Sequence, residues 1–150
     1  MQLYKLGKYD IISWKLEIEG GDKLDEDKLL EVGEYHQTFN DLMGLAIPSY
    51  KIYRSKGLPS HLIKRKHFDC LKHIDDIPDI ISSPDYIGIN PNEPGDSIEL
   101  IKMYDKNILI GIKLDADEDY LYISSMYVIQ ESKIERRLNG GRIKKINEDA

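Results

Sequence analysis

Two histidines flank a basic stretch in the middle of the chain, in the string HLIKRKH. His61 and His67 are six positions apart, which places them about 120° apart on an ideal helix, so they do not form the i, i+4 pair that binds a metal. An imidazole has an ordinary pKa of about 6.5 and exchanges protons near neutral pH. The two histidines are therefore candidate acid–base catalysts, and Lys64 and Arg65 between them are candidate substrate contacts.

Polar side chains also interrupt two apolar runs that alternate like strands. Lys102 falls in an apolar row of the run SIELIKMY, while Ser125 and Tyr127 lie two residues apart in YLYISSMYVI. Residues two apart on a strand share a side, so we expect both hydroxyls to point the same way, beside Leu121, Ile123 and Ile129. The alternatives are a lysine that only extends its ammonium group to solvent at a sheet edge, and Ser and Tyr as ordinary strand residues.

Three arginines, Arg136, Arg137 and Arg142, add cations toward the end of the sequence. Imidazole, ammonium, hydroxyl and guanidinium groups together suit the cleavage of RNA. RNA carries its own nucleophile, the 2′-hydroxyl, so an enzyme needs only a base, an acid for the leaving oxygen and cations for the charge that develops on the phosphate. We expect no metal and no cofactor, because the chain has one cysteine and lacks the HExxH, GxGxxG, P-loop and GxSxG patterns.

The spacing of apolar residues predicts the elements that carry these groups. A strand is expected over residues 11–19, a helix from 25 to a C-cap at Gly44, a strand over 50–54, a basic helix beginning near His61 and a short helix over 78–83. Four alternating runs follow at 86–90, 97–104, 108–114 and 120–129, with short turn-rich connections that favour an antiparallel meander. Residues 131–138 are compatible with a helix, and a basic RIKKI segment follows.

This order of elements predicts an α+β fold. Helices should pack on one face of a four-stranded antiparallel meander, with a short C-terminal helix, and the other face should meet water or a ligand. With 41% hydrophobic and 32% charged residues in 150, we expect one folded domain over the whole chain. No run of about 18 uncharged apolar residues occurs, so we expect no membrane partner and a cytoplasmic location.

The net charge of −6 is unevenly distributed. Residues 51–75 carry seven basic and two acidic side chains and residues 129–150 carry six and four, whereas the rest of the chain is acidic. Such basic islands attract phosphate locally, but the acidic remainder weakens the long-range attraction used by non-specific nucleic-acid binders. General coating of DNA is therefore disfavoured.

An ordered set of strings resembles one family of nucleases. HLIKRKH, IDDIPDIISSPDYIGI, SIELIKMYD, ILIGIKLD, YLYISSMYVI and KIERRLNGGRIKKI are together similar to the phage-associated branch of the barnase, EndoU, colicin and RelE-like nucleases (PBECR). The resemblance covers residues 46–145 as a nuclease core and leaves 1–45 as a variable lead-in. It implies N-terminal helices followed by a four-stranded antiparallel meander, and a metal-independent ribonuclease, often a toxin or effector domain carried by phages.

The resemblance also assigns functional positions. The family's paired histidines fall on His61 and His67, its strand lysine on Lys102, its hydroxyl-x-Tyr element on Ser125 and Tyr127, and its terminal Gly-Arg element on Gly141 and Arg142. This chain has Ser124-Ser125 where the family commonly has threonine before Met-Tyr, and a hydroxyl is retained.

Two hypotheses of different classes follow. The first is an endoribonuclease that acts on a structured RNA such as tRNA and leaves a 2′,3′-cyclic phosphate, with a cognate inhibitor protein as a further partner to look for. The second is a catalytically inactive protein of the same fold that binds RNA or inhibits a partner. The acidic segments favour the second hypothesis, because acidic surfaces often meet basic partners.

Overall fold

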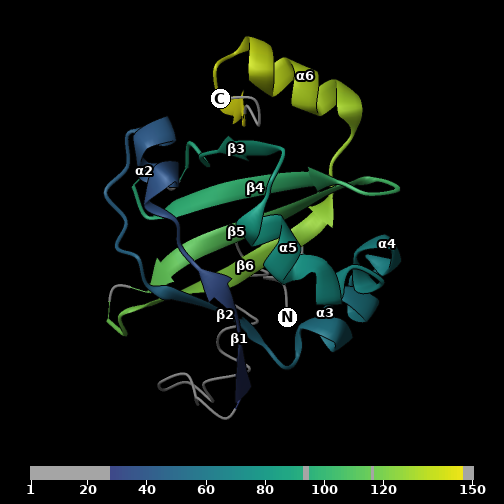
Figure 1. Ribbon diagram of the computed structural model, residues 1–150. Coiled ribbons are helices and arrows are strands. Elements are labelled where there is room, and N and C mark those ends of the chain that lie inside the picture. Colours follow the sequence, from purple (N-terminus) through teal and green to yellow (C-terminus); the bar gives the residue numbers. More distant parts are fainter. Residues whose placement is uncertain (1–27, 93–94, 116, 147–150) are drawn as a thin grey trace.

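A seven-stranded sheet forms the centre of the molecule, as the computed structural model in Figure 1 shows. The structure describes residues 28–92, 95–115 and 117–146. The strand order is β1-β2-β6-β5-β4-β3-β7, and all neighbours are antiparallel except β2 and β6, which are parallel. The strands are β1 Leu29–Glu34, β2 Lys51–Ser55, β3 Tyr86–Gly88, β4 Ser97–Met103, β5 Asn107–Asp115, β6 Tyr120–Val128 and β7 Ile143–Lys145.

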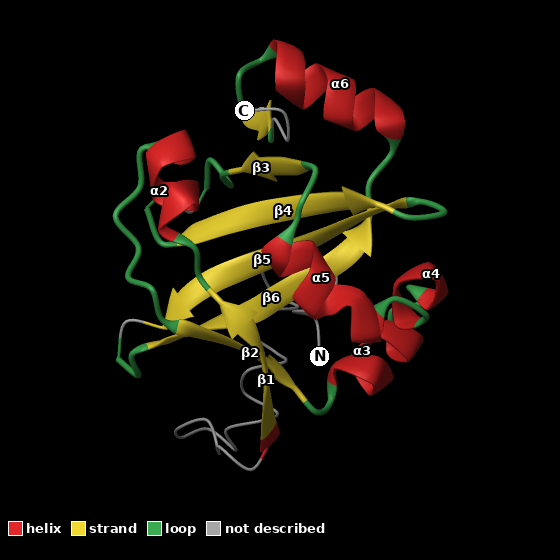
Figure 2. Cartoon of the chain, viewed as in Figure 1, coloured by secondary structure: helices red, strands yellow, loops and turns green. Residues whose placement is uncertain are grey.

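Short helices connect these strands (Figure 2). They are α2 Gln37–Met43, α3 Leu58–Lys64, α4 Phe68–Leu71, the 3-10 turn η3 Ile74–Asp76, α5 Ile77–Ser82 and α6 Glu131–Asn139. Pro78 lies in the first turn of α5, where its missing N–H is not needed by the helix. The helices predicted over 78–83 and 131–138 are thereby confirmed within one residue at each end.

The predicted α+β class is confirmed, but the sheet is larger than the four-stranded meander we expected. β3, β4, β5 and β6 do form that meander, with successive strands paired antiparallel. β2 and β1 extend the sheet beyond β6, and β7 extends it beyond β3. The prediction missed the edges because β7 has only three residues and β1 has apolar spacing typical of a helix.

The helix predicted from residue 25 to Gly44 was wrong in its first half. Residues 29–34 form β1, which pairs with β2, and only Gln37–Met43 is helical. Gly44 closes that helix in the left-handed conformation (φ 66°), as predicted. The basic helix is also interrupted: Lys66 has φ 62° and separates α3 from α4. The strand predicted over residues 11–19 lies outside the described residues.

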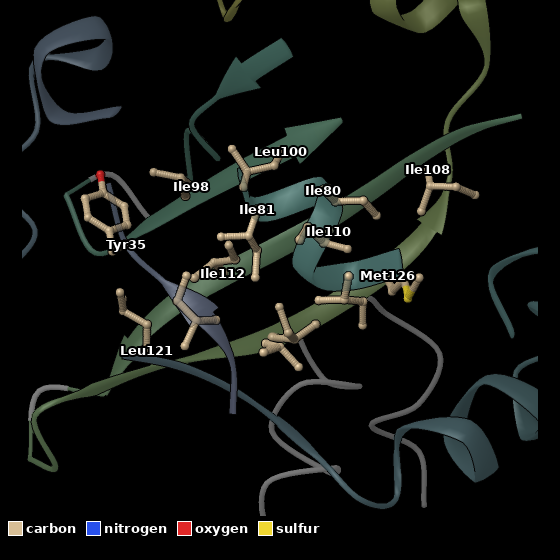
Figure 3. Close-up of a cluster of buried hydrophobic side chains, with 14 of the residues drawn as sticks. Tyr35, Ile80, Ile81, Ile98, Leu100, Ile108, Ile110, Ile112, Leu121 and Met126 are labelled. Atoms are coloured by element: carbon tan, nitrogen blue, oxygen red, sulfur yellow. The ribbon is translucent and has the colours of Figure 1, made fainter. Parts of the chain in front are cut away.

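One face of the sheet, which we call the helix-covered face, packs against the helices between β2 and β3. Figure 3 shows Ile80 and Ile81 of α5 lying over Ile98, Ile110 and Ile112 of the central strands. Each of these five side chains is at most 1% exposed. Burial of this apolar surface is the main driving force for folding, at roughly 1.5–3 kcal/mol per large side chain.

In the part of the chain that the structure describes, a second, smaller apolar cluster covers one end of the opposite face. Ile134 of α6 and Ile143 of β7 pack there with Ile101, Leu109 and Ile129. Beyond this cluster the opposite face presents polar and aromatic side chains. Because α6 and β7 border that polar region, Arg137 of α6 and Arg142, just before β7, can reach it.

Candidate active site

A row of residues across three strands forms the floor of the candidate site on the opposite face. Glu99 of β4 pairs with Gly111 of β5, and Gly111 pairs with Ser125 of β6. Glu99 is only 7% exposed. The next residues along β4, Leu100 and Ile101, belong to the apolar clusters on the two faces of the sheet. A buried carboxylate requires partners that offset its lost hydration.

Two arginines from the C-terminal segment supply those partners. Arg137 Nη1 of α6 and Arg142 Nη2, which precedes β7, donate to Glu99 Oε1 at 3.3 and 3.4 Å. Arg142 Nε also donates to the carbonyl oxygen of Ile89 at 3.3 Å. Two cations therefore hold the carboxylate through its Oε1.

Tyr127 adds a phenol to the same cluster. Burial raises the pKa of Tyr127, and the Glu99 carboxylate raises it further, whereas a hydrogen bond with Arg137 and the charge of Arg142 act in the opposite direction. The pKa rises on balance, so the phenol is protonated at neutral pH. A protonated phenol can donate a hydrogen bond or a proton to a bound group.

A small hollow lies beside Glu99, with a volume of about 20 Å³. It is lined by Asn90, Ser97, Ile98, Glu99, Gly111, Ile112, Ser124 and Ser125. The glycine makes room for the hydroxyls, because a Cβ on Gly111 would come within 2.4 Å of Ser125 Oγ and 3.3 Å of Ser124 Oγ. The space holds about one water-sized group, such as a hydroxyl, so any larger ligand would have to lie across the face.

A β-bulge directs Ser125 and Tyr127 toward this site. Gly111 pairs with Ser125 but the next residue, Ile112, pairs with Ile123, so Ser124 is an extra residue in β6. The prediction that Ser125 and Tyr127 share a side was correct, as was their placement beside Ile129. Their placement beside Leu121 and Ile123 was wrong, because the bulge reverses the alternation and leaves both of those side chains in the helix-covered core.

Lys102 lies on the helix-covered face, away from this site. Its neighbour in register is Ile108, whose side chain belongs to the large core. Lys102 Nζ donates to the carbonyl oxygen of Ser83 at 2.6 Å and to Ser83 Oγ at 3.1 Å, at the end of α5. The prediction that Lys102 joins Ser125 and Tyr127 in one site is therefore not supported by the geometry, which gives the lysine a helix-capping contact.

The two predicted imidazoles also lie in the helix layer. His61 is in α3, whose Leu58 and Leu62 pack in the large core, and His67 immediately precedes α4. Lys64 and Arg65 belong to the same segment. Arg136 is exposed on α6. Of the predicted site residues, the structure brings together four, namely Ser125, Tyr127, Arg137 and Arg142.

Glu99 was not among the predicted site residues. It lies in the nearly continuous apolar run SIELI. A carboxylate in a strand that is buried on both faces is the signal that could have identified it.

A second polar cluster surrounds His73, on the helix-layer side of the β4–β5 turn. Its Nδ1 lies 2.9 Å from Asp76 Oδ2 and its Nε2 lies 2.8 Å from Asp105 Oδ1. The imidazole stacks on Tyr104, with ring centroids 4.6 Å apart. Lys72 also pairs with Asp105. Carboxylates only accept hydrogen bonds, so both ring nitrogens carry protons when both contacts form. This cluster ties the turn to η3.

The described residues contain no group of three or more His, Cys, Asp or Glu side chains arranged to hold a metal ion. None of their helices is both long enough and apolar enough to span a membrane.

The sequence of this chain matches a known family over residues 31–136, described as phage-Barnase-EndoU-ColicinE5/D-RelE like nuclease3 (PBECR3). The chain belongs to this family. The predicted resemblance to PBECR nucleases is thus confirmed, and membership indicates a nuclease of the barnase, EndoU, colicin and RelE type. The PBECR3 match includes Glu99, Gly111, Ser125 and Tyr127 and ends before Arg137. Comparisons with curated proteins and with solved structures each found no significant match.

Proposed function

We propose that this PBECR3 protein is a metal-independent endoribonuclease whose active site is the Glu99 cluster. The observation that supports this most directly is a buried carboxylate held between two arginines, with a protonated phenol in the same cluster. A base, an acid and fixed cations are the three functions that cleavage through the 2′-hydroxyl of RNA requires.

Glu99 is proposed as the general base. Its Oε1 is occupied by Arg137 and Arg142, so Oε2 receives the proton of the ribose 2′-hydroxyl. The 2′-oxygen then attacks the adjacent phosphorus. The hollow beside Glu99 admits a group of hydroxyl size, which fits this step better than the binding of a whole nucleotide.

Arg137 and Arg142 are proposed to stabilise the phosphorane that forms. Attack by the 2′-oxygen places additional negative charge on the non-bridging phosphate oxygens, and guanidinium groups match phosphate geometry well. Arg137 and Arg142 are only partly exposed, with side-chain exposures of 16% and 32%. Partial burial strengthens their interaction with that charge.

Tyr127 is proposed as the general acid. Its raised pKa keeps the phenol protonated over the neutral range, and the phenolic proton passes to the leaving 5′-oxygen as the P–O5′ bond breaks. The products are a 2′,3′-cyclic phosphate and a 5′-hydroxyl. Ser125 donates a hydrogen bond to a phosphate oxygen. These assignments replace His61, His67 and Lys102, which lie on the other side of the sheet.

Incubation of the purified full chain with bulk tRNA in EDTA tests this proposal. We expect fragments with 2′,3′-cyclic phosphate ends, and no cleavage of DNA of the same sequence, since DNA lacks the 2′-hydroxyl. Binding of RNA without cleavage under all conditions would contradict the enzyme and support the alternative of a catalytically inactive binding protein.

Expression in bacteria provides an independent test. An active ribonuclease should slow growth of the host unless an inhibitor is present, and Glu99→Gln should relieve that effect. Equal growth of cells expressing the parent chain and the variant, at equal protein levels, would argue against a toxin-like role.

A further inference from the structure

A row of tyrosines lies next to the Glu99 row on the same face of the sheet. Tyr53 of β2 pairs with Tyr122 of β6, which pairs with Lys113 of β5, which pairs with Ser97 of β4. The side chains of Tyr53 and Tyr122 point to the opposite face, because their neighbours along the strands, Ile52 and Leu121, lie in the helix-covered core. This row therefore runs beside Glu99, Gly111 and Ser125, offset by two residues along β5.

The aromatic rings of this row are held in place by one another. Tyr120 packs edge-to-face against Tyr53, with centroids 5.6 Å apart, and against Tyr122, with centroids 6.5 Å apart. All three side chains are partly buried. Rings that are already ordered by such contacts lose little conformational freedom when a ligand stacks on them.

Charge along this face decides how a nucleic acid would lie. Arg137, Arg142 and Lys113 put positive charge at the Glu99 row and beside Tyr122. Beyond the tyrosines, the β5–β6 turn carries Asp117, Glu118 and Asp119, which would repel a phosphate backbone. The cations therefore attract a bound strand to the Glu99 row and the tyrosine row, and the acidic turn keeps its phosphates from extending past the tyrosines.

We infer that Tyr122 and Tyr53 form a subsite for the base of an unpaired nucleotide next to the scissile phosphate, with Lys113 binding the adjoining phosphate. This rests on the proposed function of the Glu99 row. Two residues along a strand span about 7 Å, which lets one nucleotide reach both rows. A base can stack on a tyrosine only when it is not paired and stacked within an RNA helix, so the substrate is a single-stranded segment or loop.

Binding measurements on the full chain with Glu99→Gln, which blocks cleavage, test this subsite separately from catalysis. The probe is a fluorescein-labelled ten-nucleotide oligouridylate, followed by fluorescence anisotropy at several salt concentrations. Adding Tyr122→Leu should weaken binding by about 5- to 150-fold, the range for loss of one base–aromatic stack. Tyr122→Phe retains the ring and should bind like the Glu99→Gln chain, called the parent in these measurements. This result would also show that the position tolerates substitution.

The salt dependence separates stacking from charge. Tyr122→Leu should leave the slope of log affinity against log salt unchanged, whereas Lys113→Ala should reduce its magnitude by about 0.7. Phe68→Leu is the matched control, since Phe68 is 57% exposed but lies on α4 in the helix layer. Its affinity should equal that of the parent.

Distinct results would overturn the two proposals. If Arg142→Ala weakens binding but Tyr122→Leu stays within twofold of the parent, the tyrosine subsite is wrong and the Glu99 site stands. If Phe68→Leu weakens binding instead, RNA binds the helix layer. If the parent does not bind the oligouridylate at all, the subsite is wrong, and cleavage of tRNA by the chain with an intact Glu99 decides the proposed function by itself.

Discussion

Glu99 and Arg142 are 43 positions apart in the chain, and Arg142 Nη2 lies 3.4 Å from Glu99 Oε1. Gly88 makes this approach possible. A Cβ on Gly88 would come within 2.4 Å of Ile143 Cγ2 and 3.1 Å of the carbonyl oxygen of Arg142. Because β3 has no side chain at that point, β7 packs closely against it and brings Arg142 over the buried carboxylate.

The close fit between Gly111 and Ser125 can be tested by a double-mutant cycle. Gly111→Ala places a Cβ 2.4 Å from Ser125 Oγ but 3.7 Å from Ser125 Cβ. The single substitution should lower the free energy of unfolding by about 1–3 kcal/mol, as expected for overpacking. Ser125→Ala in the same chain should restore most of that loss, because it removes the clashing oxygen. Additive effects of the two changes in urea unfolding would contradict this packing.

Lys102 should contribute to stability and not to cleavage. Lys102→Met keeps the apolar part of the side chain but removes the bonds to Ser83, which should lower the free energy of unfolding by about 1–2 kcal/mol. Lys106→Met, which removes an exposed pair with Asp69, is the matched control and should change stability by less than about 1 kcal/mol. A large loss of cleavage rate in folded Lys102→Met would contradict this and show that the lysine takes part in cleavage.

The His73 cluster should make stability depend on pH. Burial of the imidazole acts to lower its pKa, but hydrogen bonds with Asp76 and Asp105 outweigh this and raise it. A raised folded-state pKa gives stability that is complete below the unfolded value of about 6.5 and is lost as pH rises through the folded value.

The carboxylate side of this cluster has the opposite sign. Bonds from Lys72 and His73 lower the pKa of Asp105, so its contribution is complete above about pH 4 and is lost on further acidification. Together these shifts predict maximal stability of the cluster between about pH 4 and 6.5. Urea unfolding across pH 5–9 should show a decline at the alkaline end that disappears in His73→Gln. An identical decline in both proteins would show that another group causes it.

Tyr127→Phe should lower the cleavage rate by about 10²–10⁴, the usual contribution of a general acid. Because the pKa of Tyr127 is raised above its ordinary value of about 10, the wild-type single-turnover rate should show no loss from tyrosine ionisation below pH 9. This role would be excluded if the wild-type rate fell with an apparent pKa near 8 and Tyr127→Phe showed the same rate and the same fall.

Local patterns were sufficient for the elements whose structure is set by local chemistry. The alternation in β4, β5 and β6, the proline in α5 and the glycine after α2 each predicted the observed element. β1 was misread as a helix, because its strand state depends on pairing with β2, which a local apolar spacing does not reveal.

The candidate site was only partly predictable for the same reason. Ser125, Tyr127, Arg137 and Arg142 were identified from residue type, and they do gather on one face. The histidines were favoured because their ordinary pKa suits acid–base chemistry, but which face of the sheet a helix covers is decided by its buried side, here Leu58 and Leu62. The bulge at Ser124 arises from the pairing of β5 with β6, so the sequence of either strand alone does not predict it.

The most direct test of the account compares cleavage of tRNA in EDTA by the parent chain, by Glu99→Gln and by the double variant His61→Ala, His67→Ala. Glu99→Gln keeps the size of the side chain and its acceptor oxygen, so a loss of rate reports the loss of the base. We predict a fall of about 10²–10⁴ for Glu99→Gln and a rate within a few-fold of the parent for the folded histidine variant. Full activity of Glu99→Gln, together with inactivity of the histidine variant, would contradict the central claim.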